Sequence, residues 1–200
     1  MRLMGWALGR RRTTSRPAAP LPGGDRWSQS HYRVALGLPV AVASVWQAQP
    51  TSRALAAGAA IAFLGVLIRA VAAGQLRKHH GLTTSGVYAI TRNPLYLGSA
   101  VMAAGFALAT DSWVAASLIA GYLAVFYPSA IRREEQRLRS RYADVFEDYV
   151  ARVPRFWPRL GWPLGTTFSW ACYFRNAEYQ AALGFVAGVA LLWLKLYRGA

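Results

Sequence analysis

The sequence predicts an all-α integral membrane protein with about five transmembrane helices. Two observations carry this prediction: 54% of the 200 residues are hydrophobic, yet the formal net charge is +15. A soluble domain does not combine so many apolar residues with so large a charge, and a disordered chain contains fewer apolar residues. The apolar and charged residues must therefore lie in separate segments.

Five apolar segments reach, or nearly reach, the length needed to cross a bilayer. Residues 54–73 carry Arg69 as their only charge, and residues 113–131 carry none. At 1.5 Å per residue each of these two segments is roughly 30 Å long, which is one hydrocarbon thickness. Two shorter segments are borderline in length. The predicted spans are 33–48, 54–73, 94–110, 112–131 and 178–197.

The third and fourth spans are predicted to form a helical hairpin over residues 95–131, because only Thr110, Asp111 and Ser112 separate them. Residues 31–200 are then a single membrane domain. Residues 1–30 are predicted to be a basic, flexible cytoplasmic tail, since they contain many Arg, Pro and Gly residues. The Arg-rich and acid-poor composition of this tail is also compatible with a mitochondrial presequence.

The basic residues gather on one side of the predicted spans. Seven lie at or before Arg33, three between positions 75 and 93, and nine between positions 132 and 175, so 19 of the 23 share one side. Positive residues favour the cytoplasm, which predicts a cytoplasmic N-terminus and an external C-terminus, as in a bacterial inner membrane. Arg69 would snorkel to the inner end of the second span. Nucleic acid is not predicted as a partner, because the basic residues border membrane spans.

No metal site is predicted. Cys172 is the single cysteine, which excludes an internal disulfide and a cysteine-based metal site. His79 and His80 are adjacent, so they would point in different directions on a helix, and His31 stands alone. We interpret all three histidines as interfacial or solvated residues.

A polar turn that runs into an apolar segment is the centre of the predicted site. Asn93-Pro94 predicts a helix start, because the Asn side chain can cap free N–H groups and Pro at the first position needs no partner. The helix N-terminus and Arg92 together favour an anion. Tyr96 lies in the first turn, and Gly98 would let a backbone or a flat ligand approach. The alternative is an ordinary capped membrane helix with an Arg among the headgroups.

An amphipathic helix is predicted to continue the fourth span. Apolar residues recur at three- and four-residue spacing with charged residues between them, so the helix can lie along the cytoplasmic headgroups until Val153-Pro154 ends it. A loop with aromatics and prolines follows, and Glu178 then precedes the last span, where an acid suits a helix N-terminus. The recurring apolar residues are Leu138, Tyr142, Val145, Phe146, Tyr149 and Val153, and the loop aromatics are Phe156, Trp157 and Trp162.

Two adjacent glutamates follow the fourth span. Adjacent helical residues point about 100° apart, so Glu134 and Glu135 should not share one environment. Glu135 has Arg132 and Arg139 about one turn away on either side, which predicts surface ion pairs. Glu134 shares its face with apolar residues such as Leu138, so we expect Glu134 to face a packed site at the membrane edge. The alternative is a charged anchor that marks the end of the span.

These blocks resemble the isoprenylcysteine carboxyl methyltransferase and phospholipid methyltransferase superfamily. The similarity covers roughly residues 81–158 and rests on LTTSGVY at 82–88, TRNPLYLG at 91–98 and the downstream glutamate pair. It implies an integral-membrane enzyme that binds S-adenosylmethionine at the cytoplasmic ends of its helices and methylates a membrane lipid or lipid-modified acceptor. The implied cofactor-binding residues are Tyr88, Arg92, Asn93, Pro94, Tyr96, Gly98, Glu134 and Glu135, and Arg92 and Glu134 are the predicted catalytic residues.

Three positions depart from the pattern of this superfamily. Val87 stands where Pro is common, and Tyr142-Ala143 where Phe-Gly is usual; both look tolerable for folding. Asn93 stands where the eukaryotic carboxyl methyltransferases carry His, which leaves the identity of the substrate open.

The charges of S-adenosylmethionine fit the predicted site. The helix N-terminus with Arg92 would hold its carboxylate, a glutamate its ammonium, and Tyr88 or Tyr96 could attract its sulfonium. No strong general base is visible, which favours an acceptor that is already nucleophilic, such as a carboxylate, a thiolate or a neutral amine. Glycines would allow the close helix packing that such a site needs. They are Gly98, Gly105, Gly121, Gly184 and Gly188.

Two alternative functions stay open. An NADPH-dependent membrane reductase of the steroid-reductase type shares the multi-span organisation and a similar Arg-His-Pro-x-Tyr run, although Asn93 and the glutamate pair favour methyl transfer. A non-catalytic membrane protein could instead bind anionic lipids through its arginines. The sequence makes no prediction of the oligomeric state.

Overall fold

The computed structural model describes residues 26–77, 81–159 and 167–199, which are all helix, turn or loop. The all-α prediction is therefore confirmed for these ranges. The elements are α1 (Arg26–Gln47), α2 (Ser52–Gln75), the short 3₁₀ helix η1 (Gly86–Ala89), α3 (Pro94–Ala109), α4 (Trp113–Arg152), α5 (Trp170–Arg175) and α6 (Tyr179–Gly199). Most of the predicted tail, His79, His80, Trp162 and the side chain of His31 lie outside the described part.

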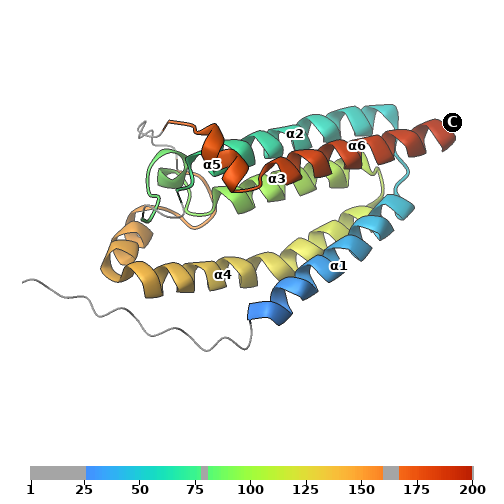
Figure 1. The fold of residues 1–200 in the computed structure, drawn as a ribbon. Coiled ribbons are helices and arrows are strands. Elements are labelled where there is room, and N and C mark those ends of the chain that lie inside the picture. The colour runs from blue at the N-terminus through green and yellow to red at the C-terminus, as the bar shows by residue number, and fades with distance from the viewer. Residues whose placement is uncertain (1–25, 78–80, 160–166, 200) are drawn as a thin grey trace, which may run out of the picture.

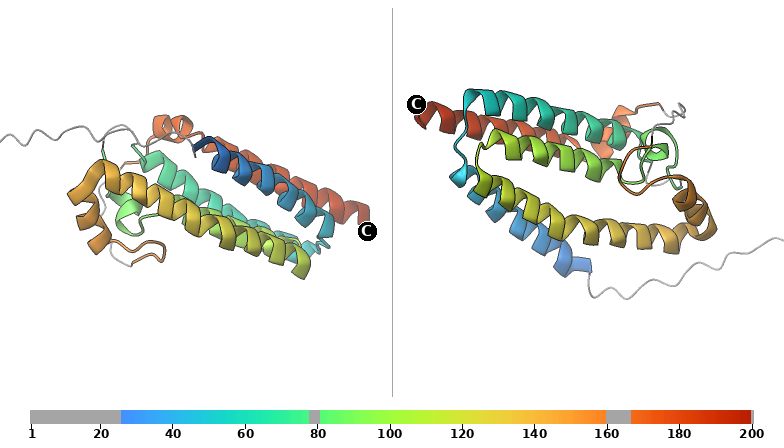
Figure 2. Two further views of the ribbon diagram at one scale, coloured as in Figure 1. Left: turned by 90° about the horizontal axis from the view of Figure 1, so that it is seen from below. Right: turned by 180° about the vertical axis from the view of Figure 1, so that it is seen from behind.

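The helices form two layers that meet at one end and diverge towards the other (Figure 1). One layer contains α2, α3 and α6, and the other contains α1 and α4, as the right-hand view in Figure 2 also shows. At the shared end, the Gln49 N–H donates to the Thr110 carbonyl at 2.7 Å, and the Thr51 hydroxyl donates to the Asp111 carboxylate at 2.8 Å. A small apolar core closes this end. Its buried members are Ala48, Leu55, Ala109 and Leu192.

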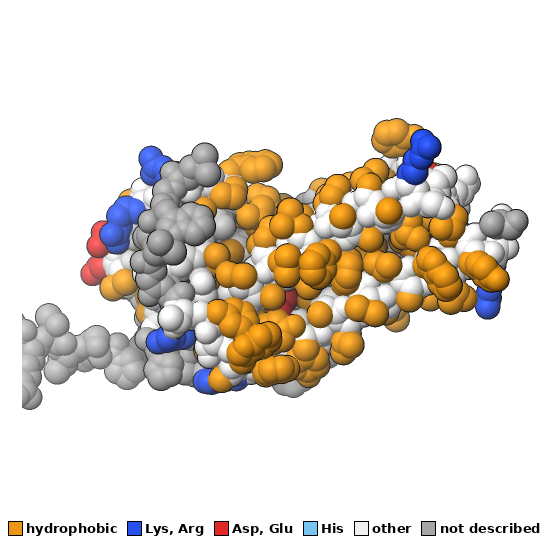
Figure 3. Space-filling model, turned by 90° about the horizontal axis from the view of Figure 1, so that it is seen from above, with side chains coloured by type: hydrophobic (Ala, Val, Ile, Leu, Met, Phe, Trp, Pro, Cys, Tyr) orange, Lys and Arg blue, Asp and Glu red, His pale blue; other side chains and the backbone are white. Residues whose placement is uncertain are grey.

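Three of the helices, α2, α4 and α6, are long and apolar enough to cross a membrane. Two shorter apolar helices accompany them, over Ala35–Gln47 and Pro94–Ala109. Each predicted span therefore coincides with an apolar helix, while the count of five membrane crossings stays a prediction. Hydrophobic side chains cover the middle of the helices, and Lys and Arg side chains gather at the ends (Figure 3). Trp46 and Trp113 are exposed at one end and Trp157 and Trp170 at the other, as in the aromatic belts of membrane proteins.

Helices α2 and α3 pack backbone against backbone through four glycines. A Cβ added to Gly58 would lie 2.4 Å from the Gly105 carbonyl oxygen, and one added to Gly98 would lie 2.8 Å from the Gly65 carbonyl oxygen. Glycine is the residue that lets two helix backbones approach this closely. The predicted packing role is confirmed for Gly98 and Gly105, whereas Gly58 and Gly65 are partners that the sequence analysis did not single out.

The other predicted glycines differ among themselves. A Cβ at Gly188 would contact the Phe106 ring at 2.7 Å, whereas one at Gly121 or Gly184 would meet nothing within 4 Å. The predicted packing role is therefore confirmed for Gly188 but not for Gly121 and Gly184 within the described part of the chain.

The short connection predicted for the hairpin over residues 95–131 is present, but the two helices that it joins, α3 and α4, diverge. Thr110, Asp111 and Ser112 connect the helices, and the Ser112 hydroxyl accepts from the Ala115 N–H at the start of α4. From this turn α3 follows α2, because its glycine surface faces that helix, and α4 follows α1. The two arms thus belong to different layers, which diverge with distance from this turn.

Helix α4 bends sharply at Ala143, where φ is 36° and ψ is −116°. Residues after the bend turn back onto the protein, and Val153 ends the helix as predicted. Phe146 and Tyr149 are only 1% and 3% exposed, because they pack with Val153 against neighbouring apolar side chains. The prediction that this aromatic face lies along the headgroups is therefore wrong for Phe146 and Tyr149, since the bend directs them into the protein.

Candidate functional site

A pocket of about 800 Å³ lies at the end where the two layers diverge. Its lining comes from the segment before α3, from the first turn of α3, and from α4 on both sides of the bend. Of the eight predicted cofactor-binding residues, seven line it together: Tyr88, Arg92, Asn93, Pro94, Tyr96, Glu134 and Glu135. Gly98 is the exception, because it packs against α2.

The predicted helix start is confirmed, with Asn93 in the capping position and Pro94 as the first helical residue. The Asn93 side chain, however, does not cap α3. Its Nδ2 donates instead to the Arg155 carbonyl oxygen at 2.9 Å, because the chain after α4 returns to this turn. The Arg92 N–H likewise donates to the Pro154 carbonyl at 2.9 Å. The returning segment thus fixes the backbone that carries Arg92.

We expected Glu134 to face a packed site and Glu135 to lie on the surface, but the structure shows the reverse burial. Glu135 is buried, with 8% of its surface exposed, whereas Glu134 is exposed. The Glu135 carboxylate pairs with Arg155 at 2.6 Å and with Arg92 at 3.5 Å. The prediction of surface ion pairs for Glu135 was wrong, because α4 turns the face that carries Ile131 and Glu135 towards the protein interior.

Neither arginine expected beside Glu135 is its partner. Arg139 pairs with Glu147 across the bend at Ala143, and Arg132 Nε donates to the Pro128 carbonyl of its own helix at 3.2 Å. Arg132 and Arg139 were expected to pair with Glu135 only because they lie about one helical turn away from it in the sequence. The long-range partners Arg92 and Arg155 depend on the return of the chain after α4, which has no local sequence signal.

Two buried polar atoms of the pocket have no hydrogen-bond partner, namely Tyr88 Oη and Arg92 Nε. Tyr88 is 7% exposed, and the Arg92 side chain is 10% exposed. The Tyr149 hydroxyl donates to the Tyr88 carbonyl at 2.5 Å and so holds the backbone of η1. An unsatisfied buried donor costs about 1–3 kcal/mol, so these two atoms indicate where a ligand would supply acceptors.

Burial raises the pKa of the Tyr88 phenol, and the nearby negative charge of Glu134 raises it further. The Tyr88 hydroxyl is therefore protonated at neutral pH and acts as a hydrogen-bond donor. Glu134 lines the same pocket, and its negative charge raises the pKa of this phenol more than any other charged group does. The pocket thus offers neutral, cationic and anionic groups within one small space.

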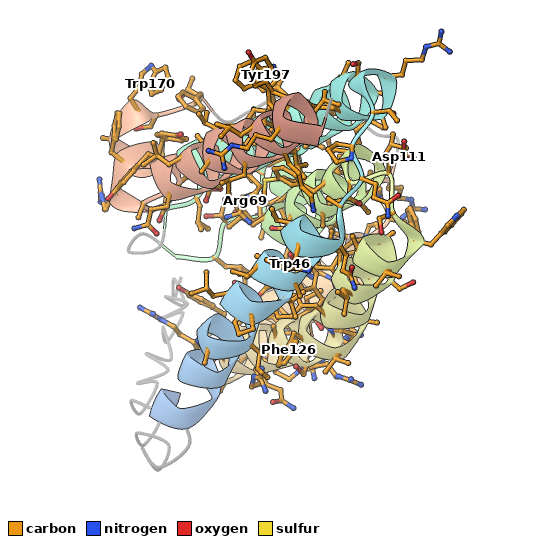
Figure 4. The ribbon with its side chains drawn as sticks, turned by 90° about the vertical axis from the view of Figure 1, so that its right-hand side faces the viewer. Trp46, Arg69, Asp111, Phe126, Trp170 and Tyr197 are labelled. Atoms are coloured by element: carbon orange, nitrogen blue, oxygen red, sulfur yellow. The ribbon has the colours of Figure 1, made fainter. Side chains whose placement is uncertain are left out.

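A second polar cluster lies behind the first turn of α3. Arg69 of α2 forms an ion pair with Glu178, and its Nη2 donates to Glu178 Oε2 at 3.0 Å. Arg69 also donates to the Ser99 hydroxyl and to the Leu95 carbonyl, the latter at 3.4 Å. Figure 4 shows Arg69 between the helices of its layer. Arg69 therefore does not snorkel, and Glu178 is its counter-charge rather than only an acid at a helix start.

The sequence analysis missed Arg155 and Ser99 altogether, and it did not predict that Arg69 and Glu178 pair with each other. An Arg inside a predicted span and an acid at the start of another were visible, and an unpaired charge at that depth is costly. That cost was the signal that could have linked them. Over the described ranges, no three His, Cys, Asp or Glu side chains lie close enough to hold a metal ion.

Comparisons with known proteins point to one family. Residues 33–145 match the model of the phospholipid methyltransferase family. The chain is 35% identical over 106 residues to the cobalt-zinc-cadmium resistance protein CzcN of Cupriavidus metallidurans, covering 53% of this chain and 48% of that protein. It is 38% identical over 84 residues to the nickel-cobalt-cadmium resistance protein NccN of Alcaligenes xylosoxydans xylosoxydans, covering 42% of this chain and 39% of that protein.

A third relative is the protein-S-isoprenylcysteine O-methyltransferase of Schizosaccharomyces pombe. It is 33% identical over 84 residues, which cover 42% of this chain and 36% of that enzyme. The chain thus spans about half or less of the length of these curated relatives. No solved structure matches the chain. Because the family match covers more than half of its residues, this integral membrane protein belongs to the phospholipid methyltransferase family, which confirms the resemblance seen in the sequence.

Proposed function

We propose that the chain transfers a methyl group from S-adenosylmethionine to a lipid-borne acceptor at the cytoplasmic face of a membrane, and that the pocket holds S-adenosylmethionine. The observation that carries this proposal is the pair of buried, unsatisfied donors at Tyr88 and Arg92 in the wall of that pocket. Its volume of about 800 Å³ lies within the range of small-molecule sites. Family membership supports the reaction type.

The charges in the pocket divide into two roles under this proposal. Glu135 is neutralised by Arg92 and Arg155, so it orients Arg92 rather than binding a ligand. Arg92 Nε and the start of α3 then hold a carboxylate. Glu134 is exposed to the pocket and holds an ammonium. The Tyr88 hydroxyl donates to a further acceptor atom of the same ligand.

When bound, S-adenosylmethionine supplies a methyl group on a positively charged sulfur, which is a strong electrophile. The protein's own task is to align the acceptor with that methyl and to exclude water. Phe146 and Tyr149 cover the pocket from the segment after the bend and exclude water from that side.

Equilibrium binding to detergent-purified protein tests this function. We expect the wild-type chain to bind S-adenosylmethionine and not NADPH. Binding of NADPH instead would favour the membrane reductase. Binding of neither, with retention of anionic lipid vesicles, would favour a non-catalytic lipid-binding protein.

A further inference from the structure

The ion pair of Arg69 and Glu178 lies behind the wall of the pocket that the start of α3 forms. Glu178 is 6% exposed, and the side chain of Arg69 is 23% exposed. Arg69 belongs to α2, and Glu178 directly precedes α6. The family match covers residues 33–145, so it includes Arg69 but not Glu178. The pair therefore connects the matched part of the chain with its last helix.

The planar guanidinium of Arg69 contacts two different elements. Its Nε and Nη2 donate to the two carboxylate oxygens of Glu178, the latter at 3.0 Å. Its Nη1 donates to the Leu95 carbonyl at 3.4 Å and to the Ser99 hydroxyl, both on α3. A carboxylate that holds one edge of this rigid fork also fixes the direction of the remaining N–H groups. Glu178 thus directs Nη1 of Arg69 towards α3.

The acceptors of this Nη1 belong to the start of α3. The Ser99 hydroxyl is buried and itself donates to the Leu95 carbonyl at 2.9 Å. Leu95 lines the pocket, as do the residues on either side of it. The Asn93 side chain does not cap this helix. The contact with Arg69 therefore holds a helix start that its own cap residue does not hold.

The same ion pair acts on the Tyr88 side of the pocket. Burial raises the pKa of the Tyr88 phenol most, followed by the charges of Glu134 and Tyr149. Glu178 raises this pKa further, and Arg69 lowers it. Both members of the pair therefore lie within electrostatic range of the buried, unsatisfied Tyr88 hydroxyl.

The position of Glu178 is set by contacts other than the one with Arg69. Asn176 Nδ2 donates to the Ala73 carbonyl at 2.8 Å and to the Leu76 carbonyl at 3.1 Å, at the C-terminal end of α2. These bonds attach the turn between α5 and α6 to α2, two residues before Glu178. Arg69 and Ala73 are four residues apart and so share one face of α2. The turn thus presents its carboxylate to Arg69.

We propose that Arg69 is a positioning residue for the pocket and that Glu178 orients it, so that the last helix completes the site. The proposal rests on the proposed function, because the ligand is S-adenosylmethionine. Glu178 holds Arg69, and Arg69 holds the start of α3 where its N-terminus faces the ligand carboxylate. An ion pair that only neutralised a buried charge would need no particular direction. Positioning, in contrast, requires the planar fork of arginine.

Arg69→Lys in detergent-purified full-length protein tests this requirement, because it keeps the positive charge and removes the fork. Hydrogen exchange without ligand reports how firmly the start of α3 is held, since the Leu97 N–H donates to the Asn93 carbonyl there at 3.0 Å. We expect exchange at residues 97–99 to become at least about tenfold faster, with residues 102–109 unchanged, and S-adenosylmethionine to bind about tenfold more weakly. Arg53→Lys, an exposed position on the same helix, is the control and should change both quantities less than about twofold.

Two further variants separate direction from charge. Glu178→Gln removes the carboxylate that orients the guanidinium, and we expect the same two changes. Its control is Glu147→Gln, which neutralises the exposed ion pair with Arg139. Ser99→Ala keeps the buried ion pair and removes only one acceptor on α3. We expect it to speed exchange at residues 97–99 about threefold or more and to weaken binding by a similar factor.

The outcomes distinguish positioning from a purely structural role. Faster exchange throughout α3 and α4, or a lower unfolding midpoint with wild-type exchange at residues 97–99, would overturn the positioning role. Faster local exchange with wild-type affinity would also overturn it, as would no change in either quantity. Failure of the wild-type chain to bind S-adenosylmethionine overturns the proposed function, and the exchange comparison still decides whether Arg69 holds the wall of the pocket.

Discussion

At the scale of single residues, Arg92 is the group whose removal tests the pocket most directly. We expect Arg92→Ala to weaken S-adenosylmethionine binding roughly ten- to 150-fold, because a charge-assisted hydrogen bond contributes about 1.5–3 kcal/mol. Arg133→Ala is the control, since Arg133 lies outside the pocket lining, and it should change the dissociation constant less than about threefold. Isothermal titration of purified protein measures both. Equal losses would mean that the arginines act only as a diffuse basic surface.

Substitution of Glu134 and Glu135 by Gln should have different effects, on ligand affinity and on stability respectively. We expect Glu134→Gln to lower cofactor affinity by about tenfold or more with an unchanged unfolding midpoint, because a bound ammonium loses its counter-charge. We expect Glu135→Gln to lower the unfolding midpoint, because Arg92 and Arg155 lose the carboxylate that they share.

Thermal unfolding and ligand titration on the same samples distinguish these two effects. A large loss of affinity in Glu135→Gln with wild-type stability would show that Glu135 itself contacts the ligand, and would contradict the roles assigned here.

At this scale, the sequence predicted the features that depend on neighbouring residues and not those that depend on contacts with distant segments. Pro94 starts α3 because its missing N–H and fixed backbone angle act within one turn. Asn93 and Glu135 were misread because their partners come from the segment near Arg155, whose position depends on the tertiary fold. The set of pocket residues was predicted better than their individual contacts, because the resemblance identified the set without its geometry.

At the scale of elements, the bend in α4 is set by Ala143, which adopts a positive φ of 36°. This backbone region costs a residue with a Cβ about 1–2 kcal/mol, and glycine adopts it freely. The Tyr142-Ala143 departure from the usual Phe-Gly is therefore a strained position, although the sequence analysis took it as tolerable for folding.

We expect Ala143→Gly to raise the free energy of unfolding by about 1 kcal/mol, because it relieves this strain. Ala151→Gly is the matched control, since Ala151 lies in regular helix, and it should lower the free energy of unfolding by about 0.5–1 kcal/mol. Denaturant unfolding in one detergent compares the two. A loss of stability in Ala143→Gly would mean that the bend is not strained.

The helices themselves were largely predictable, because apolar length is a local property of the sequence. The arrangement of α3 was not, since it depends on which face carries glycine. Gly58 and Gly65 on α2 match Gly98 and Gly105 on α3, and this match places α3 against α2 rather than against α4. Recognition of paired glycines at seven-residue spacing in both segments could have predicted this packing.

At the scale of the whole molecule, the charge distribution predicts the orientation in the membrane. A reporter fused after Ala200 should be outside the cytoplasm, and one inserted near Gln75 should be inside, because 19 of the 23 basic residues lie on the side of Gln75. Alkaline phosphatase and fluorescent protein fusions read the two sides. Both fusions on one side would contradict the five-span topology and the cytoplasmic location of the pocket.

The ion pair between Arg69 and Glu178 also has a consequence for biosynthesis. Glu178 follows Arg69 by 109 residues, so α2 enters the membrane with an uncompensated charge while the rest of the chain is still being translated. A charged residue within an inserting helix costs up to about 2.5–3.5 kcal/mol, and the counter-charge of Arg69 arrives only with Glu178, just before α6. Completion of the last helix therefore stabilises an earlier one, and a ribosome that stops before Glu178 leaves a product that membrane proteases can recognise as unfinished.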